Sequence, residues 1–316
     1  MSLQETHRCG TVAIIGRPNV GKSTLLNRFL GEKIAIVSPK PETTRDRLLG
    51  ILTLRNAQIL FLDTPGIYRG PRTLLAKHQV QAARQAIEEA NVLLLMTAAQ
   101  SGILEEDRQV IRLLSKSKGQ SPSGTIPVFL AINKVDRVEK KRVLPQIEEV
   151  GRLFPFKEIF PLSATKGTNV DSLLETLCAS LPEGPALYPP DQVTDRSTRS
   201  QVQELIREKT LLFTHEEIPH SIAVIIEEWR PGKKTGTYIR ATLYVERESQ
   251  KGILIGTQGG LLKRIGQAAR PEIQELVEGS VFLDLWVKVA ENWRKDPRRL
   301  REFGYGGNLP IYASSS

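Results

Sequence analysis

The octapeptide GRPNVGKS, Gly16 to Ser23, decides the fold of this chain. It fits the pattern G-x-x-x-x-G-K-S/T, in which the glycines let the backbone turn so that successive N–H groups converge on phosphate oxygens. An apolar run, residues 11–16, precedes it, and an amphipathic segment, residues 21–31, follows it. A fortuitous glycine-rich turn is the alternative, but such a turn needs neither neighbour. The stretch therefore predicts a phosphate-binding loop between a strand and a helix N-terminus.

The sequence around this loop predicts a doubly wound α/β domain with a mostly parallel sheet. Continuous Val-, Ile- and Leu-rich runs separated by helical segments are typical of a sheet that is covered on both faces. The expected strands are residues 11–16, 47–54, 57–63, 91–98, 126–134 and 158–164. The expected helices include residues 21–31, 73–90 and 105–116. The Ser- and Gly-rich segment 115–125 is expected to be a surface loop, and we assign it no function.

A proline-rich stretch separates two predicted domains. Four prolines lie within the nine residues from Pro182 to Pro190. Neither a helix interior nor a sheet interior tolerates such a run. We expect a first domain over residues 1–182, a linker over 183–196, and a second domain with a basic tail over 197–316. The second domain should hold a helix, two strands, a helix broken at glycines and a third strand, which is a small α+β arrangement with helices on one side of the sheet. These elements are residues 197–213, 220–229, 237–247, 250–277 and 281–289.

Composition places the chain among globular proteins with a polyanionic partner. Its 316 residues suffice for two domains, and no apolar run approaches the roughly 20 residues that span a bilayer. The start of the chain resembles neither a signal nor a transit peptide, so the cytoplasm is the expected compartment. Cys9 and Cys178 are expected to be reduced thiols. The net charge of +9 suggests nucleic acid as a partner, and basic residues cluster locally, for example at Lys263 and Arg264.

Four residues are expected to form a magnesium–phosphate site. Lys22 would reach the β- and γ-phosphates, while the Ser23 hydroxyl would bind Mg²⁺. Asp63 ends the third apolar run and would hold the same ion through water. The polar segment 38–47 predicts a switch that folds over the γ-phosphate, with Thr44 completing the Mg²⁺ shell; a mobile surface loop is the alternative. The predicted catalytic residues are Lys22, Thr44 and Gly66, the last through an N–H that senses the γ-phosphate.

A second group of residues predicts selection of guanine. Asp136, the end of the NKVD stretch, can accept hydrogen bonds from the ring and exocyclic N–H groups of guanine, whereas adenine offers no such pair. Ser163 and Ala164 close the sixth run and would lend backbone N–H groups to the guanine oxygen. We therefore expect GTP or GDP as the ligand. The predicted nucleotide site comprises Gly16, Arg17, Pro18, Asn19, Val20, Gly21, Lys22, Ser23, Thr24, Asp63, Thr64, Pro65, Gly66, Ile67, Asn133, Lys134, Val135, Asp136, Ser163 and Ala164.

The second domain carries a predicted RNA-binding loop. Gly256, Thr257, Gln258 and Gly259 form a G-x-x-G turn between two helical segments, and in KH domains such a turn clamps a single-stranded RNA backbone. Lys263 and Arg264 would add positive charge on the following helix. A helix C-cap turn is the alternative. For the basic segment 294–305, an RNA contact and a solvated helix both stay open. Trp286 alternates with apolar residues on an expected strand, which predicts a core position.

These motifs together resemble the Era family of GTPases, within the TrmE-Era-EngA-YihA-Septin-like superfamily. The resemblance rests on GRPNVGKSTLLN, TTRDR and DTPGI in the first domain, and on REK, VERESQKGILIG and LDLWVKV in the second. It implies a P-loop GTPase domain followed by a KH type 2 domain, and Mg²⁺-dependent hydrolysis of GTP to GDP and phosphate. It also implies binding to the 3′ region of 16S rRNA and assistance in 30S ribosomal subunit maturation and assembly. A peripheral contact with the inner membrane belongs to the same implied set, and a monomer is our default expectation.

Ile67 predicts slow intrinsic hydrolysis. It stands where Ras-type switches carry the Gln that orients the attacking water, and a hydrocarbon cannot make that hydrogen bond. In similar GTPases the residue that matches Asn19 holds a K⁺ ion, which supplies charge near the β- and γ-phosphates. We therefore expect K⁺, or a partner RNA or ribosome, to complete catalysis.

Three other functions compete with an RNA-binding GTPase switch. A metabolic P-loop phosphotransferase would have no use for a guanine-selecting NKVD. A tRNA-modifying relative with the same nucleotide motifs carries, by resemblance, a large extra N-terminal domain and a reactive C-terminal cysteine, and this sequence shows neither. A membrane-associated role would need an amphipathic anchor, which is not evident in the sequence.

Overall fold

The computed structural model describes residues 7–38, 40, 43–67, 74–117, 126–215, 218–232 and 236–305. Residues 118–125 of the Ser- and Gly-rich segment lie outside the described residues. By its contacts the chain divides into two compact units. Unit 1 comprises Met1–Val37, Thr44–Pro71 and Gln79–Asp195, and unit 2 comprises Ser38–Thr43, Arg72–His78 and Arg196–Ser316.

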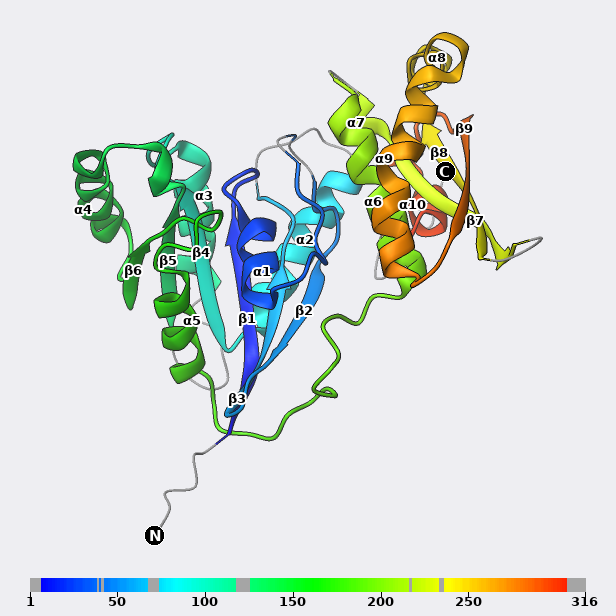
Figure 1. The fold of residues 1–316 in the computed structure, drawn as a ribbon. Coiled ribbons are helices and arrows are strands. Elements are labelled where there is room, and N and C mark those ends of the chain that lie inside the picture. Colours follow the sequence, from blue (N-terminus) through cyan, green and yellow to red (C-terminus); the bar gives the residue numbers. More distant parts are fainter. Residues whose placement is uncertain are drawn as a thin grey trace, which may run out of the picture. The chain divides into compact units, whose positions relative to one another are not determined.

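Unit 1 is built on a six-stranded sheet with the order β2-β3-β1-β4-β5-β6 (Figure 1). Only β2 runs antiparallel to its neighbour, β3; the other pairs are parallel, so the predicted mostly parallel sheet is confirmed. The strands are β1 (Arg8–Gly16), β2 (Leu48–Thr53), β3 (Ala57–Asp63), β4 (Val92–Ala98), β5 (Val128–Asn133) and β6 (Glu158–Pro161). Because the parallel strands end at one edge, the residues that follow them are brought together there.

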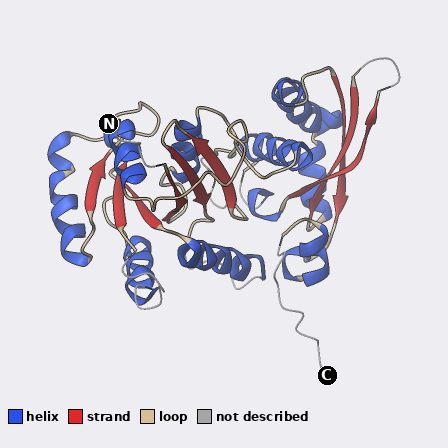
Figure 2. Cartoon of the chain, turned by 90° about the horizontal axis from the view of Figure 1, so that it is seen from below, coloured by secondary structure: helices blue, strands red, loops and turns tan. Residues whose placement is uncertain are grey.

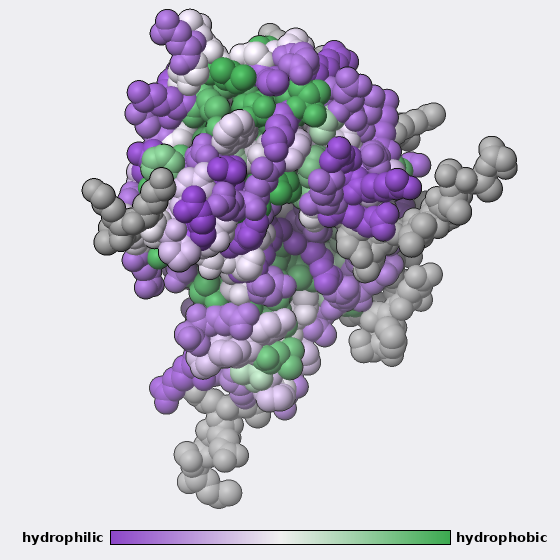
Figure 3. Space-filling view, turned by 90° about the vertical axis from the view of Figure 1, so that its right-hand side faces the viewer, coloured by the Kyte–Doolittle hydropathy of each residue, from purple (hydrophilic) through white to green (hydrophobic). Residues whose placement is uncertain are grey.

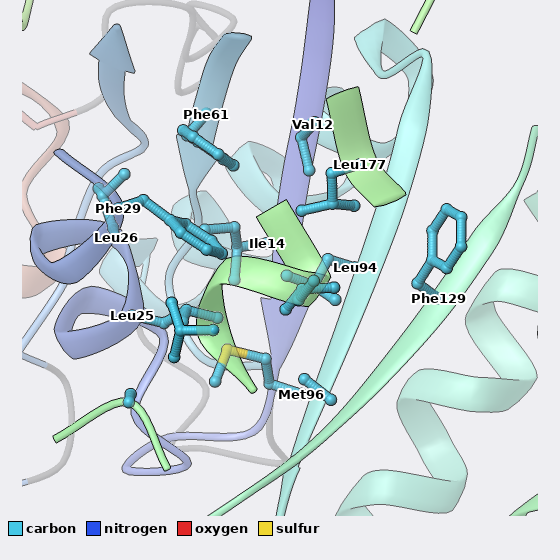
Figure 4. Close-up of a cluster of buried hydrophobic side chains, with 14 of the residues drawn as sticks. Val12, Ile14, Leu25, Leu26, Phe29, Phe61, Leu94, Met96, Phe129 and Leu177 are labelled. Atoms are coloured by element: carbon cyan, nitrogen blue, oxygen red, sulfur yellow. The ribbon is translucent and has the colours of Figure 1, made fainter. Parts of the chain in front are cut away.

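Helices cover both faces of this sheet, as Figure 2 shows from below. Alternation along β1 explains why: Val12 and Ile14 belong to one buried cluster, while Ala13 and Ile15 belong to another. The first cluster also contains residues of α1 and α5 (Figure 4), and the second contains residues of α2, α3 and α4. The helices are α1 (Lys22–Leu30), α2 (Leu74–Glu89), α3 (Glu105–Ser117), α4 (Leu144–Leu153) and α5 (Val170–Ala179), with short 3₁₀ turns η1 (Val135–Arg137) and η2 (Lys140–Arg142).

The proline-rich segment is attached to unit 1 by hydrogen bonds. The Oε1 atom of Gln58 accepts from the N–H groups of Leu187 at 2.7 Å and Tyr188 at 2.9 Å. The Thr194 hydroxyl donates to the Leu49 carbonyl at 2.8 Å. Gln58 is completely buried on β3, so its two hydrogen bonds fix this segment against β3. The Thr194 hydrogen bond fixes it against β2.

Unit 2 is a small α+β unit whose sheet has the order β7-β8-β9. Strand β7 is antiparallel to β8, and β9 is parallel to β8. The glycine-broken helix of the prediction appears as α8, η3 and α9. The elements are α6 (Thr198–Phe213), α7 (Ile218–Ser221), β7 (Ala223–Pro231), β8 (Thr237–Val245), α8 (Glu248–Ile255), η3 (Thr257–Gly259), α9 (Gly260–Leu276), β9 (Val281–Val289), η4 (Trp293–Lys295) and α10 (Pro297–Glu302).

The prediction that Trp286 lies in the core is wrong. On β9 the buried residues are Val281, Leu283 and Val287, whereas Phe282 is 67% exposed and Trp286 is 51% exposed. Since strand side chains alternate between faces, Trp286 shares the outer face with Phe282. Figure 3, which looks at the side where Figure 1 shows β7 and β9, shows hydrophobic patches among hydrophilic residues.

The tryptophan that does fill a core is Trp293, which is fully buried. It packs in a cluster with residues of β7, η4, α10 and the start of α2. Its indole N–H donates to the Ser221 carbonyl at 2.8 Å. Ala223 and Tyr244, a cross-strand pair, contact this cluster. Helices α6, α8 and α9 contact the sheet at β7 and β9. The cluster shows that η4 and α10 cover part of the sheet face to which Ala223 and Tyr244 belong, which the sequence did not predict.

Candidate guanine-nucleotide site and RNA-binding loop

The phosphate loop connects β1 to α1 through backbone conformations that suit glycine. Gly16 has φ 153° and Gly21 has φ 104°, and a Cβ atom at Gly21 would lie 2.3 Å from the Asn133 Nδ2 atom. Asn19, between them, has φ 63°. Helix α1 starts at Lys22, directly after this turn. The loop therefore presents its N–H groups at a helix N-terminus, the arrangement that binds phosphate.

Lys22 lies within this loop. Its side chain is buried, and Nζ donates to the carbonyl oxygens of Gly16 at 3.2 Å and Arg17 at 3.1 Å. Burial lowers the pKa of Lys22 to about 8, and the negative charge of Asp63 opposes that shift. A buried ammonium that is held only by carbonyls has most to gain from an anionic ligand. The arrangement suits a phosphate group.

Three oxygen-bearing side chains meet next to Lys22. The Ser23 hydroxyl donates to the Asp63 Oδ2 atom at 2.6 Å, and the Thr44 hydroxyl lies 3.3 Å from the same atom. The Ser23 and Thr44 hydroxyls are 3.0 Å apart. They come from the start of α1, the segment before β2 and the end of β3. Two hydroxyls and one carboxylate are hard oxygen ligands, and they fit Mg²⁺ when phosphate oxygens and water complete its shell.

Asn133 connects the motifs of the predicted base pocket. Its Nδ2 atom donates to the Val20 carbonyl at 2.8 Å, and its Oδ1 atom accepts from the N–H groups of Lys134 at 2.7 Å and Ala164 at 3.0 Å. Lys134 Nζ donates to the Asn19 carbonyl at 2.7 Å. Burial is the main cause that lowers the pKa of Lys134. One buried amide thus holds together the phosphate loop, the NKVD turn and the loop after β6.

Asp136 lies on η1, and 23% of its side chain is exposed. Its carboxylate is 4.0 Å from Arg137 Nε. The residue is exposed, so the carboxylate is accessible to a base. The N–H groups of Ser163 and Ala164 already donate within the protein, to the Thr168 carbonyl and to Asn133. Their contact with the guanine oxygen stays a prediction.

The segment after Asp63 lies against the phosphate loop. Thr64 is fixed by a 2.9 Å hydrogen bond from its hydroxyl to the Ile14 carbonyl, and the Ile67 N–H donates to Gly16 O at 3.2 Å. A Cβ atom at Gly66 would lie 2.5 Å from the Pro18 nitrogen. Ile67 packs against the buried cluster of α2 and α3. Its hydrocarbon side chain is therefore used in packing.

Asp107 is a residue of this region that the sequence did not reveal. It is fully buried, and its Oδ2 atom accepts from Arg17 Nε at 3.1 Å and from the Leu104 N–H at 3.0 Å. Burial raises the pKa of Asp107, while the hydrogen bond from Leu104 and the Arg17 charge lower it. Arg17 also donates to the Ser101 hydroxyl. The second residue of the phosphate loop is thus anchored to α3, and an acid in a first helical turn was too ordinary a signal to find it.

The predicted RNA-binding loop forms between α8 and α9. Gly256 has φ 70°, Gly259 has φ 76°, and Gln258 between them has φ 52°. Thr257 and Gln258 are exposed, as is Lys263 on the first turn of α9. The Arg264 guanidinium lies over the Phe213 ring, 4.9 Å from its centroid. The loop offers glycine backbone and nearby positive charge to a polyanion.

The fold and these sites define a P-loop guanine-nucleotide-binding protein with a second, KH-type unit. The family model described as 50S ribosome-binding GTPase matches residues 11–134, and the KH domain model matches residues 217–294. The protein named GTPase Era from Geotalea uraniireducens (strain Rf4) is 45% identical over 302 residues, which are 96% of this chain and 99% of that protein. This chain belongs to the Era family of GTPases.

Solved structures agree with this assignment. The crystal structure of Era in complex with MgGDPNP and nucleotides 1506–1542 of 16S ribosomal RNA matches with a TM-score of 0.90 and 44% identity, over 95% of this chain and 99% of that one. An Aquifex aeolicus Era variant bound to GDP and AlF4⁻ matches with a TM-score of 0.89 and 43% identity, over 94% and 99% of the two chains. Searching the described residues for a helix long and apolar enough to cross a membrane finds none.

Proposed function

We propose that this chain is a GTP-hydrolysing switch that binds the 3′ region of 16S rRNA and assists maturation and assembly of the 30S subunit. The observation that carries the proposal is the presence, in one chain, of the Ser23–Thr44–Asp63 oxygen cluster beside Lys22 and of an exposed G-x-x-G loop. Relatives that are similar over nearly the whole chain have been solved with MgGDPNP, with GDP and with 16S rRNA nucleotides. The assignment leaves no role for a metabolic phosphotransferase.

The nucleotide chemistry follows from the residues of unit 1. Bound Mg²⁺ would neutralise the β- and γ-phosphate oxygens, with Ser23 and Thr44 as direct ligands and Asp63 acting through water. Lys22 adds a buried positive charge to the same phosphates. Gly66 directs a backbone N–H toward the γ-phosphate. Asp136 selects guanine, because replacing guanine by adenine leaves its carboxylate without donors.

Potassium provides a test of how hydrolysis is completed. Ile67 is packed against apolar residues, so a partner other than this side chain must assist the attack of water. We place a K⁺ ion at Asn19, beside the β- and γ-phosphates. GTP hydrolysis should then be faster in K⁺ than in Na⁺ at equal ionic strength. Equal rates in the two salts would remove K⁺ from the mechanism and leave RNA or the ribosome as the stimulating partner.

Unit 2 holds part of the predicted switch segment. The Thr43 carbonyl accepts a hydrogen bond from the buried Arg207 of α6, and Lys40 Nζ lies 3.2 Å from the His215 Nδ1 atom. Thr44, the proposed Mg²⁺ ligand, is the next residue along the chain. Binding of Mg²⁺ and the γ-phosphate at Thr44 would therefore act on residues that contact α6. The contact between Thr43 and Arg207 supports RNA binding that depends on the bound nucleotide.

We also assign domain boundaries and the residues that contact RNA. Residues 1–182 form the GTPase domain, 183–196 the linker and 197–316 the RNA-binding domain, in which Gly256 to Gly259, Lys263 and Arg264 contact RNA. We place the protein in the cytoplasm as a monomer. Peripheral contact with the inner membrane stays a prediction from family resemblance.

Binding of the full chain to an RNA with nucleotides 1506–1542 of 16S rRNA tests this function. Affinity should be highest with a GTP analogue, and lower with GDP and without nucleotide. The double variant Thr257→Asp/Gln258→Asp places two carboxylates beside the RNA backbone and should abolish binding, whereas Thr257→Ser/Gln258→Asn is the neutral control. Equal affinity in all three nucleotide states would keep the RNA-binding function and reject the switch. Equal binding of ATP and GTP would reject guanine selection.

A further inference from the structure

Unit 2 contains a cavity that the G-x-x-G loop does not use. It has a volume of about 320 Å³, and it opens between the end of α6, α7 and the start of α8. This volume is at the lower end of the range of about 300–1,000 Å³ that small-molecule sites occupy. Its lining includes Phe213, His215, Ile218, Arg247, Gln250 and Ile253.

The walls combine an aromatic ring with positive charge. Phe213 contributes the ring, and Arg264 of α9 lies over that ring, 4.9 Å from its centroid. Ile253 adds an apolar surface that is 56% exposed. Arg247 is exposed, and its guanidinium forms no ion pair with an acid among the described residues. A flat apolar surface beside guanidinium groups is the combination on which nucleobases stack.

Gln250 supplies a fixed polar group in this cavity. Only 7% of the residue is exposed, and its Oε1 atom accepts from the N–H groups of Glu246 at 2.9 Å and Arg247 at 3.1 Å. These two bonds fix the plane of the amide. Its Nε2 atom donates to none of the described residues. The amide therefore offers donors whose natural partner is an acceptor on a ligand.

The cavity continues from the proposed RNA-binding loop. Helix α8 provides Gln250 and Ile253 to the cavity and ends at Ile255, one residue before Gly256. With a helical rise of about 1.5 Å per residue, Gln250 is about 9 Å along the axis from Gly256. Arg264, on the helix that follows the loop, reaches Phe213 in the cavity wall. A strand held at the loop would have its neighbouring nucleotides close to the opening.

We propose that this cavity receives one unpaired nucleobase of the RNA strand that the G-x-x-G loop clamps. The base stacks on the Phe213 ring, and an acceptor on its edge, such as a carbonyl oxygen or a ring nitrogen, receives a hydrogen bond from Gln250 Nε2. Arg247 contacts the adjoining phosphate. The site thereby adds base selection to a clamp that holds only backbone. The inference rests on the proposed RNA-binding function.

Two exposed residues test the cavity in the full chain with a GTP analogue bound. Ser249→Trp fills the cavity from its rim, and Arg247→Ala removes the phosphate contact. Arg152→Ala, on an exposed face of α4, is the control with the same loss of charge. The probe is the 1506–1542 RNA, intact or with an abasic nucleotide at one unpaired position after another. Thermal unfolding of each variant establishes that its fold is intact.

The cavity predicts a specific pattern of affinities. One abasic position should weaken binding to the wild-type protein roughly tenfold, which is the scale of a lost base–aromatic stack. Ser249→Trp should bind the intact RNA roughly tenfold more weakly and lose nothing more at that position, and Arg247→Ala should lose about fivefold. Wild-type affinity in both variants, or an equal further loss at every abasic position in Ser249→Trp, would overturn the inference. Failure of the wild-type protein to bind the intact RNA would instead reject the proposed function.

Discussion

Lys22 links the protonation of the protein to nucleotide binding. Its pKa of about 8 lies below the ordinary lysine value because the ammonium is buried. The unfolded chain therefore binds more protons than the folded one between about pH 8 and pH 10.5, and without nucleotide stability should rise with pH over that interval. Phosphate groups restore the charged form. Nucleotide binding above pH 8 should consequently take up a proton.

Calorimetry of GDP binding in buffers of different ionisation enthalpy measures that uptake. With a pKa of about 8, we expect roughly three quarters of a proton at pH 8.5 and roughly one tenth at pH 7. Burial also lowers the pKa of Lys134, so the measurement is repeated with Lys134→Arg, which stays charged. The same proton number at both pH values would show that Lys22 is already charged in the free protein.

Asp136 should determine which base is bound. Guanine presents two donors to its carboxylate, whereas xanthine presents one donor and one acceptor, which an amide can match. Asp136→Asn should therefore weaken GDP binding by about 100-fold or more and strengthen binding of xanthosine diphosphate. Titration of both nucleotides measures the exchange. Parallel losses for both would mean that Asp136 supports the loop without contacting the base.

The nucleotide residues show what a sequence can predict at this scale. Lys22, Ser23 and Asp63 come together because each stands at the end of an apolar run or the start of a helix, and parallel strands end at one edge. The role of Asn133 as a connector and the burial of Asp107 depend on which carbonyls and amides a packed loop leaves unpaired. Nothing in the spacing of residues encodes that.

The segment after β3 depends on close contact with the phosphate loop. Gly66→Ala would place a Cβ atom 2.5 Å from the Pro18 nitrogen and 2.7 Å from its Cα atom, and both are backbone atoms that cannot rotate away. We expect a loss of about 1–3 kcal/mol in unfolding free energy and at least a tenfold slower GTP hydrolysis. Urea denaturation and single-turnover hydrolysis measure the two effects.

Gly151→Ala, within α4, is the control for that substitution. A Cβ atom there meets nothing within 4 Å, so this variant should gain about 0.5–1 kcal/mol of stability with unchanged hydrolysis. A Gly66→Ala protein that hydrolyses GTP at the wild-type rate would mean that the segment moves away from Pro18 before the reaction.

Asp284 is a hydrogen-bonding centre on the outer face of the unit 2 sheet. Asp284 on β9 accepts from the Tyr238 hydroxyl at 2.7 Å, Trp286 Nε1 at 3.0 Å and Arg240 Nε at 3.2 Å. Burial raises the pKa of Asp284, but these hydrogen bonds and the Arg240 charge outweigh it, so the net shift is downward. The stabilisation is therefore present above the ordinary Asp value and is lost as pH falls through the lowered one.

Asp284→Asn should lower the unfolding free energy by about 0.5–1 kcal/mol at pH 7 and by progressively less as the pH falls toward 2. Urea denaturation across this interval measures the difference. Glu291→Gln, which has no hydrogen bond or ion pair among the described residues, is the control. A constant difference at all pH values would show that shape, not charge, matters at this position.

Trp286 shows how a strand pattern can be misread at the level of elements. Its apolar neighbours Leu285 and Val287 lie on the opposite face, because strand side chains alternate. Asp284 and Lys288 share a face with Trp286, so the sequence already marks that face as the outer one. The order of the strands, by contrast, followed from runs and glycines, although β1 begins three residues before its predicted start and β6 ends three residues before its predicted end.

At the scale of the whole molecule, both folds could be predicted because their motifs are local. The division of the chain could not, since residues 38–43 and 72–78 group with unit 2 although they lie far from it in sequence. Leu75, for example, is buried in the same cluster as Trp293 and Phe303. Such grouping depends on tertiary contacts, which periodicity does not report.

Lys40 is hydrogen-bonded to His215 within unit 2. It precedes Thr44 by four residues, so the nucleotide state should reach His215 through this short segment. In the wild-type protein we expect RNA affinity with a GTP analogue to exceed that with GDP by about 5–150-fold, the usual size of a coupling between two sites.

Lys40→Ala should reduce that ratio severalfold while GDP affinity stays unchanged, because the nucleotide contacts involve other residues. Lys141→Ala removes the same charge from an exposed position on η2 and should leave the ratio intact. The 1506–1542 RNA, titrated in both nucleotide states, gives the four affinities that each variant requires. A ratio that survives in Lys40→Ala would direct attention to the hydrogen bond from Arg207 of α6 to the Thr43 carbonyl as the route of coupling.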